Sequence, residues 1–159
     1  MSDSALLLAQ AVLTALPAAW LTTGLRDNIL HADMNRAIVA EVMAMTRLQA
    51  AFPADFAQVS GRAVTDPALH RLVFRLIVVA ELAALLLLWA GAGALLLAAL
   101  GMAAPTWLAL AGTVAFTAIW AGFLTAGNHF CYWYCHDGAQ TTHFHLTLWG
   151  MATAIFLAL

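Results

Sequence analysis

One long uncharged stretch constrains the fold of this chain more than any other feature. The 45 residues from Leu82 to Ala126 contain no Asp, Glu, Lys, Arg or His. About 20 apolar residues are enough to cross the hydrocarbon core of a bilayer. Because a glycine and a proline lie close together at Gly101 and Pro105, the stretch predicts two membrane helices joined by a tight turn. We therefore expect a membrane protein.

The composition of the whole chain agrees with this expectation. Of its 159 residues, 64% are hydrophobic and 9% are charged. This length leaves room for about four membrane helices and for no separate soluble domain. The formal net charge of −2 gives no support for nucleic-acid binding, and two cysteines are too few for a disulfide scaffold.

We predict an all-α fold, a four-helix transmembrane bundle with an amphipathic interfacial helix between its first and second helices. A single integral membrane domain is expected over residues 1–159. Asp66 and Pro67 mark the start of the second helix, because proline suits a first turn. The four spanning helices are expected at about residues 5–24, 67–100, 105–127 and 139–159.

The first apolar segment has an alternative interpretation as a cleaved signal peptide, since small residues follow Leu16. A signal peptide begins with a positively charged region, and nothing positive precedes Arg26. The sequence therefore favours a retained helix, with a kink at Pro17.

The amphipathic helix is expected over residues 33–50, with Asp33 as its N-cap and Pro53 ending the segment. Two interpretations remain open: a helix in the membrane interface, or one packed on the bundle without a binding role. Its apolar stripe comprises Met34, Ile38, Val42, Met45 and Leu48.

A dense group of potential metal ligands lies near the fourth helix. Histidines at 129, 136 and 143 recur every seven residues and would share one helix face, while the two cysteines share another. Imidazole and thiolate bind zinc and copper, and imidazole binds haem iron. The Cys-x3-Cys spacing matches no standard site, and histidines at the membrane boundary are also ordinary. A local disulfide is a further alternative, although it would be strained in a helix. The candidate ligands are His129, His136, His143, Cys131 and Cys135.

Glu81 is an ionisable residue inside the second apolar helix. A charge at such a depth costs about 2–3 kcal/mol on insertion scales, so it is usually paired, protonated or turned to a cavity. We expect its partner to be an arginine on the preceding turns, such as Arg75, or a His or Tyr from the segment before the fourth helix. A proton-handling role is the alternative to a structural one.

Small residues recur at four-residue spacing on the third helix, at Ala118, Gly122 and Ala126. Such a ridge lets membrane helices approach closely. The sequence does not distinguish packing within the bundle from packing against a partner.

The order of several loose motifs resembles the predicted small integral membrane proteins of domain of unknown function 2165. The resemblance implies a four-helix membrane protein of the bacterial inner membrane, with a cytoplasmic N-terminus and a first long loop in the periplasm. It implies no known activity. The residues that carry it are Asp27-Asn28, Asn35, Val39, Val42-Met43-Ala44-Met45, Thr65-Asp66-Pro67-Ala68-Leu69-His70, Glu81, Gly122-Phe123, Gly127, Phe130 and Trp133.

The chain departs from this family pattern at several polar positions. The family has an Asp where this chain has His31, a His near Glu41, and Gly-Glu-Trp near residues 128–130. The exchange of acid and base would keep a buried polar network that includes His31 and Glu41 while altering a metal site. The family's basic N-terminus is also absent here.

The two indications of orientation disagree. All six basic residues are arginines between Arg26 and Arg75, which by the positive-inside rule places residues 25–70 in the cytoplasm. The family resemblance places them in the periplasm, and we adopt that orientation. In either case residues 25–70 and 128–138 share one side if the chain crosses four times.

No catalytic triad order, phosphate loop or dinucleotide fingerprint is present, so we predict that the chain is not an enzyme. We expect an accessory or scaffolding subunit of a larger membrane complex, for example a respiratory or photosynthetic one, surrounded by lipid and contacting other subunits or further copies of itself. The alternative is a redox protein that binds a metal or a tetrapyrrole; no bound cofactor is the main expectation.

Overall fold

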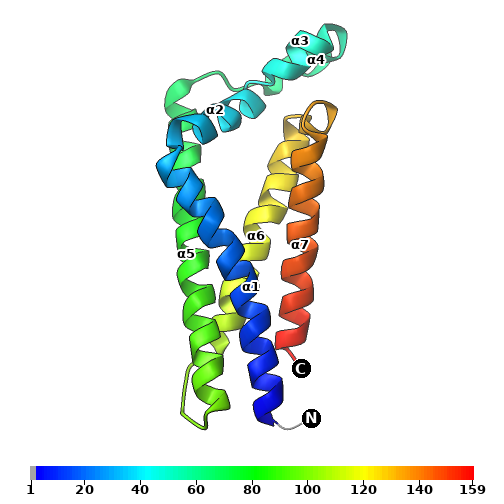
Figure 1. Cartoon of the computed structure of the whole chain (residues 1–159). Helices are drawn as coiled ribbons and strands as arrows, with labels where there is room; N and C mark the ends of the chain where they lie inside the picture. Colours follow the sequence, from blue (N-terminus) through cyan, green and yellow to red (C-terminus); the bar gives the residue numbers. More distant parts are fainter. Residues whose placement is uncertain (1–2) are drawn as a thin grey trace.

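The computed structural model describes residues 3–159, and every regular element in that range is helical. Each long helix packs on the next in the order α1, α5, α6, α7, whereas α1 and α7 contact each other little. Consecutive helices run antiparallel and form an elongated bundle (Figure 1). The four long helices are α1 (Asp3–Leu30), α5 (Pro67–Ala99), α6 (Trp107–His129) and α7 (Asp137–Leu157).

Three of these helices, α1, α5 and α6, are long and apolar enough to cross a membrane. The 21-residue α7 is not among the three. Its length is sufficient, but its first turns carry Gln140, His143 and His145, which lower its mean hydropathy. The all-helical prediction is therefore confirmed, and three of the four predicted spanning helices have the length and hydropathy needed to cross a membrane.

Local sequence signals set both ends of α5. The Asp66 carboxylate accepts a hydrogen bond from the backbone N–H of Ala68 at 2.8 Å, and Pro67 occupies the first turn, as predicted. At the other end Gly101 has φ +81°. The N–H groups of Gly101 and Met102 donate to the carbonyls of Ala98 and Leu97. These two hydrogen bonds form a Schellman motif, which ends the helix and begins the predicted turn.

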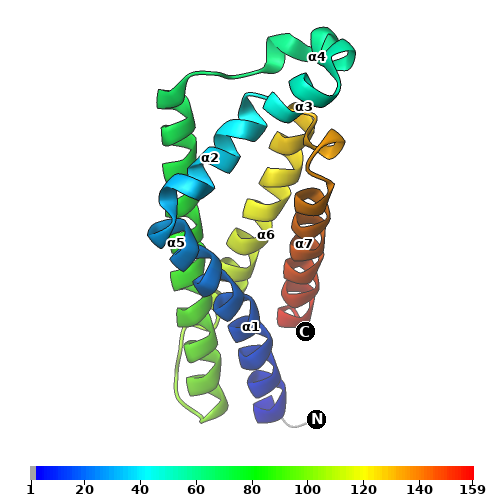
Figure 2. The ribbon, with the colours of Figure 1, turned by 45° about the horizontal axis from the view of Figure 1, so that its top comes forward.

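A layer of short helices covers one end of the bundle, away from both termini (Figure 2). The single helix predicted over residues 33–50 is wrong, because the backbone of Met45 turns left-handed at φ 54° and divides the segment. Asp33 lies in the first turn, and His31 is the N-cap. Pro53 separates two short helices and starts the second. The layer consists of α2 (Ala32–Met43), α3 (Thr46–Ala51), α4 (Pro53–Val59) and the 3₁₀ turn η1 (Ser60–Arg62).

The predicted apolar stripe of this layer is exposed at one end and buried at the other. Met34 and Ile38 on α2 are exposed. Met45 and Leu48 instead pack in a buried cluster with Cys131, which precedes the 3₁₀ turn η2 (Tyr132–Tyr134). The layer is thereby fastened to the connection between α6 and α7.

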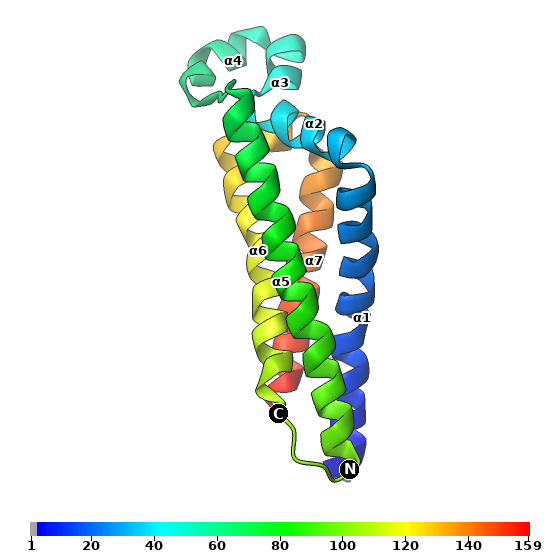
Figure 3. The ribbon, with the colours of Figure 1, turned by 90° about the vertical axis from the view of Figure 1, so that its left-hand side faces the viewer.

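The main core lies about halfway along the bundle and receives side chains from all four long helices. Trp20 of α1 packs edge-on against Trp120 of α6, with ring centroids 5.2 Å apart. Such T-shaped pairs stabilise a core beyond the area they bury. The buried members are Ala18, Leu21, Ala84, Leu88, Phe116, Trp120 and Leu146. Both termini and the turn after α5 lie at the end opposite the short helices (Figure 3).

Candidate functional site

The predicted metal ligands are not brought together. His129 is exposed at the end of α6, whereas His136 is the N-cap of α7 and His143 points into a group of aromatic rings. Cys131 and Cys135 are free thiols. Within residues 3–159, no group of three His, Cys, Asp or Glu side chains is placed to hold a metal ion. The heptad spacing failed as a guide because the chain leaves the helix at Phe130 and turns left-handed at Cys131, φ 53°.

Polar contacts instead join the short-helix layer to the connection between α6 and α7. The Arg47 Nε lies 2.6 Å from the Glu41 Oε1, and the Arg47 Nη1 donates to the carbonyl of Cys135 at 3.4 Å. The Nε2 of His136 lies 3.8 Å from the same Glu41 oxygen. Glu41 is half-buried and paired with Arg47, whereas His31, the other residue of the predicted polar network, is exposed.

The charge state of His136 follows from this setting. Burial lowers the pKa of its imidazole below the usual value, the Arg47 guanidinium lowers it further, and the Glu41 carboxylate acts in the opposite direction. The imidazole is therefore held neutral near pH 7.

His143 lies between two aromatic rings. Its ring stacks on Trp120 at a centroid distance of 5.5 Å and on Tyr132 at 6.2 Å, and Phe123 packs beside it at 5.0 Å. The His143 Nδ1, the Trp120 Nε1 and the Tyr132 hydroxyl are buried and form no hydrogen bond among the described residues. These four rings therefore form a buried aromatic cluster in which three polar atoms have no hydrogen-bond partner among the described residues.

Glu81 is buried in the bundle, with 3% of its surface exposed. The Asn28 Nδ2 of α1 donates a hydrogen bond to its Oε2 at 2.6 Å. The predicted partners, an arginine of α5 or a His or Tyr before α7, are therefore wrong. The Asn28 amide therefore links α1 to α5 in the half of the bundle near the short helices.

Two other residues predicted as buried polar groups lie at the surface. Arg75 is exposed on the third turn of α5, and His31 is exposed at the junction of α1 and α2. Helical periodicity places Arg75 on the opposite side of α5 from Val73 and Ala80, which face α6 across the groove.

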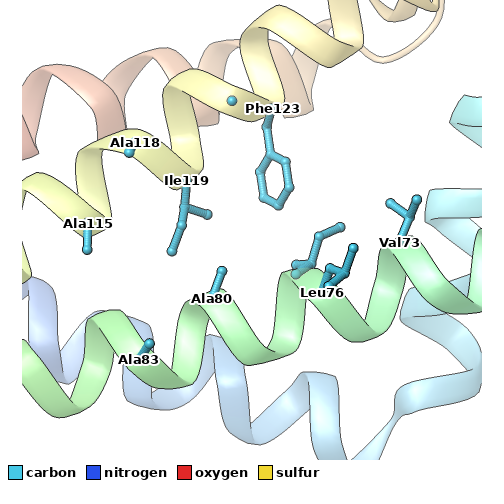
Figure 4. A pocket seen from close by; sticks show the side chains of 10 residues that line it. Val73, Leu76, Ala80, Ala83, Ala115, Ala118, Ile119 and Phe123 are labelled. Atoms are coloured by element: carbon cyan, nitrogen blue, oxygen red, sulfur yellow. The ribbon is translucent and has the colours of Figure 1, made fainter.

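An apolar groove of about 560 Å³ runs between α5 and α6. Figure 4 shows the side chains of Val73 and Leu76 on α5 across from Phe123 and Ile119 on α6. Its α6 wall includes Ala118 and Gly122 of the predicted ridge, and all three ridge residues are exposed, Ala126 among them. The ridge is therefore not used for packing within the bundle. The other lining residues are Ile77, Ala80, Ala83 and Ala115.

Other glycines make the close helix contacts inside the bundle. A Cβ added at Gly112 of α6 would lie 2.6 Å from the backbone nitrogen of Leu88, and one at Gly91 of α5 would overlap the backbone of Ala109. One at Gly150 of α7 would overlap the side chain of Thr117. A Cβ at Gly122 meets nothing within 4 Å. Gly122 therefore has room for a side chain, whereas Gly91, Gly112 and Gly150 do not.

The match to a protein family agrees with this membrane architecture. The sequence pattern of the predicted small integral membrane proteins, domain of unknown function 2165 (DUF2165), matches residues 6–159. The chain belongs to this family. No curated protein and no solved structure matches the chain.

Sequence reasoning missed two parts of the polar interior of this DUF2165 protein. Asn28 was noted only as a family motif, although an amide near the end of an apolar helix is a reasonable partner for a buried carboxyl. The stacking of Trp120 and Tyr132 on His143 had no sequence signal, because the three residues lie on different elements.

Proposed function

We propose that this protein is a non-enzymatic subunit that holds a transmembrane helix of a larger membrane complex in the groove between α5 and α6. The observation that carries the proposal is the exposed ridge of small residues on α6 beside an apolar groove. Helix association in a bilayer depends on close backbone approach, which small residues permit.

A helix fits this groove better than lipid chains alone. Lipid tails fill any apolar surface and need no small residues, whereas a ridge at four-residue spacing matches the groove of a crossing helix. The chain already uses glycine for such contacts at Gly91 and Gly112, where neighbouring backbones meet. Gly122 offers the same opportunity to a partner.

We further propose that the chain crosses the bacterial inner membrane four times, with the short helices on the periplasmic face. The support is that residues 31–66 and 130–136 lie at one end of the bundle and both termini at the other (Figure 1). With its exposed Met34 and Ile38, α2 would lie in the interface.

Photo-crosslinking tests the docking of a partner helix. A photoreactive amino acid in place of Ala118 is expected to form adducts with one protein of higher mass in native membranes. The substitution Gly122→Leu should abolish these adducts because it fills the groove without disturbing the fold. Gly93→Leu on α5 is the matched control, since Gly93 is also exposed, open to added atoms and outside the groove.

Three outcomes would overturn the proposal. Adducts that survive Gly122→Leu would show that the groove is not the docking surface. Adducts with lipid alone would make the groove an ordinary lipid contact, and adducts with a second copy alone would indicate a homo-oligomer in place of a subunit of a larger complex.

Native thiols test the orientation. Cys135 is partly exposed at the short-helix end, whereas Cys131 is buried. A membrane-impermeant maleimide applied to intact spheroplasts should label Cys135, and Cys135→Ser should remove the label. Labelling only after the inner membrane is opened would reverse the orientation.

A further inference from the structure

Two exposed arginines lie on the first turns of α5, at the end of the bundle that carries the short helices. Arg71 and Arg75 form no ion pair or hydrogen bond within residues 3–159. By contrast, Arg36 pairs with Asp33 at 2.8 Å and Arg47 pairs with Glu41. Because Arg71 and Arg75 are four residues apart, they project from one face about one turn apart.

The same face of α5 continues as apolar surface. Leu82 and Leu86 follow Arg75 at helical spacing and are 44% and 62% exposed. The face is therefore a strip with two cations at one end and exposed leucines below them. It lies on the opposite side of α5 from the groove residues Val73 and Ala80.

The depth of the arginines follows from the length of the helix. Between Arg75 and the C-terminal end of α5 at Ala99, Glu81 is the single ionisable residue. At 1.5 Å per residue these two dozen residues span roughly 36 Å, against about 30 Å for the hydrocarbon core. With the C-terminal end of α5 at the far edge of the hydrocarbon core, Arg75 and Arg71 would lie at the level of the lipid phosphates.

We propose that Arg71 and Arg75 bind the phosphate of an anionic phospholipid whose acyl chain lies along Leu82 and Leu86. Guanidinium groups bind phosphate through paired hydrogen bonds, and two of them one turn apart can clamp one phosphodiester. An anionic lipid suits the strip because a zwitterionic headgroup already carries an ammonium to balance its phosphate. The site is independent of the groove proposed for a partner helix.

Lipid nanodiscs provide the test. The full-length protein in phosphatidylcholine discs should be stabilised against heat when phosphatidylglycerol is added, and 0.5 M salt should diminish the shift. Arg71→Gln combined with Arg75→Gln should weaken phosphatidylglycerol binding roughly 30-fold, or about 2 kcal/mol at 1.4 kcal/mol per tenfold. Native mass spectrometry should show the matching loss of retained phosphatidylglycerol.

The control removes the same amount of charge from the same end. Arg26→Gln combined with Arg36→Gln should leave binding unchanged, because these residues lie on α1 and α2. Equal weakening in both double variants would reduce the effect to net charge and overturn the site. The absence of any phosphatidylglycerol shift in the wild type would overturn it as well, as would an equal shift with inorganic phosphate in phosphatidylcholine discs.

Discussion

The two halves of the α5–α6 pair are built differently. In the half near the Gly101 turn, Gly91 lies against the backbone of Ala109 and Gly112 against that of Leu88, so the helices touch. In the half near the short helices, Ala80 and Gly122 line a groove that no side chain of residues 3–159 fills (Figure 4). Both halves carry small residues on α6, but Ala109 and Gly112 are buried in the first, whereas the ridge residues Ala118, Gly122 and Ala126 are exposed in the second.

The difference shows that small residues alone do not bring helices together. Two helices that cross at an angle separate with distance from the crossing point, and the glycines fix that point near Gly91 and Gly112. Further along, the larger residues Ile119 and Phe123 line the space between the two helices. What remains between the helices is a surface available to a partner.

A matched pair of glycine substitutions should show the largest difference in stability between the two halves. Gly112→Ala should cost about 3 kcal/mol of unfolding free energy, because the new methyl group would meet the backbone of Leu88 and both helices must move. Gly122→Ala should instead be neutral or stabilise the isolated protein by about 0.5–1 kcal/mol, since glycine is costly within a helix. Unfolding by SDS titration in mixed micelles measures both.

The Gly112 and Gly122 variants can also contradict the proposed difference in packing between the two halves. Similar stability changes for Gly112→Ala and Gly122→Ala would mean that the upper half of α6 is packed as tightly as the lower half. The groove and the ridge would then have no role in docking.

A second experiment concerns what holds the upper half of α5 to α1. Glu81→Leu should lose about 1–3 kcal/mol because the Asn28 amide loses its acceptor, whereas Glu81→Gln should be tolerated as a hydrogen-bonding replacement. Adding Asn28→Leu to Glu81→Leu should restore part of the loss, since no polar group is then left unpaired.

The same SDS titration measures this cycle, and two other outcomes have clear meanings. Loss of cellular function with intact assembly in Glu81→Gln would indicate proton or cation handling. Equal tolerance of Glu81→Leu and Glu81→Gln would mean that the carboxyl reaches water and that the buried pair with Asn28 contributes nothing.

The smallest expected effect is a pH dependence confined to the short-helix layer. The pKa of His136 is lowered on folding by burial and by Arg47, so the folded state favours the neutral ring. Its contribution is fully present above the unfolded pKa of about 6.5 and is lost as the pH falls through the folded value. The protection of the α3 amides against hydrogen exchange, relative to their intrinsic rates at each pH, should therefore fall below about pH 6.5, and His136→Asn should remove that dependence. An unchanged profile in His136→Asn would assign the effect to another group.

Signals that act within a few residues predicted the fold well. Asp66 and Pro67 start α5 where expected, and Gly101 ends it through hydrogen bonds to the preceding turn. The amphipathic segment was predicted less well, because Met45 adopts a left-handed conformation that its residue type does not favour. Its burial against Leu48 and Cys131 compensates for that conformation.

The sequence by itself determined that this protein is helical and belongs in a membrane, because a long stretch without charge permits little else. It also identified Glu81 and the ridge containing Gly122 as unusual. Only the tertiary structure decided that Glu81 meets Asn28, that His136 and His143 lie apart, and that Gly122 remains exposed. Helical periodicity fixes the face on which a residue lies, but the crossing of α5 and α6 and the turn at Cys131 decide which faces meet.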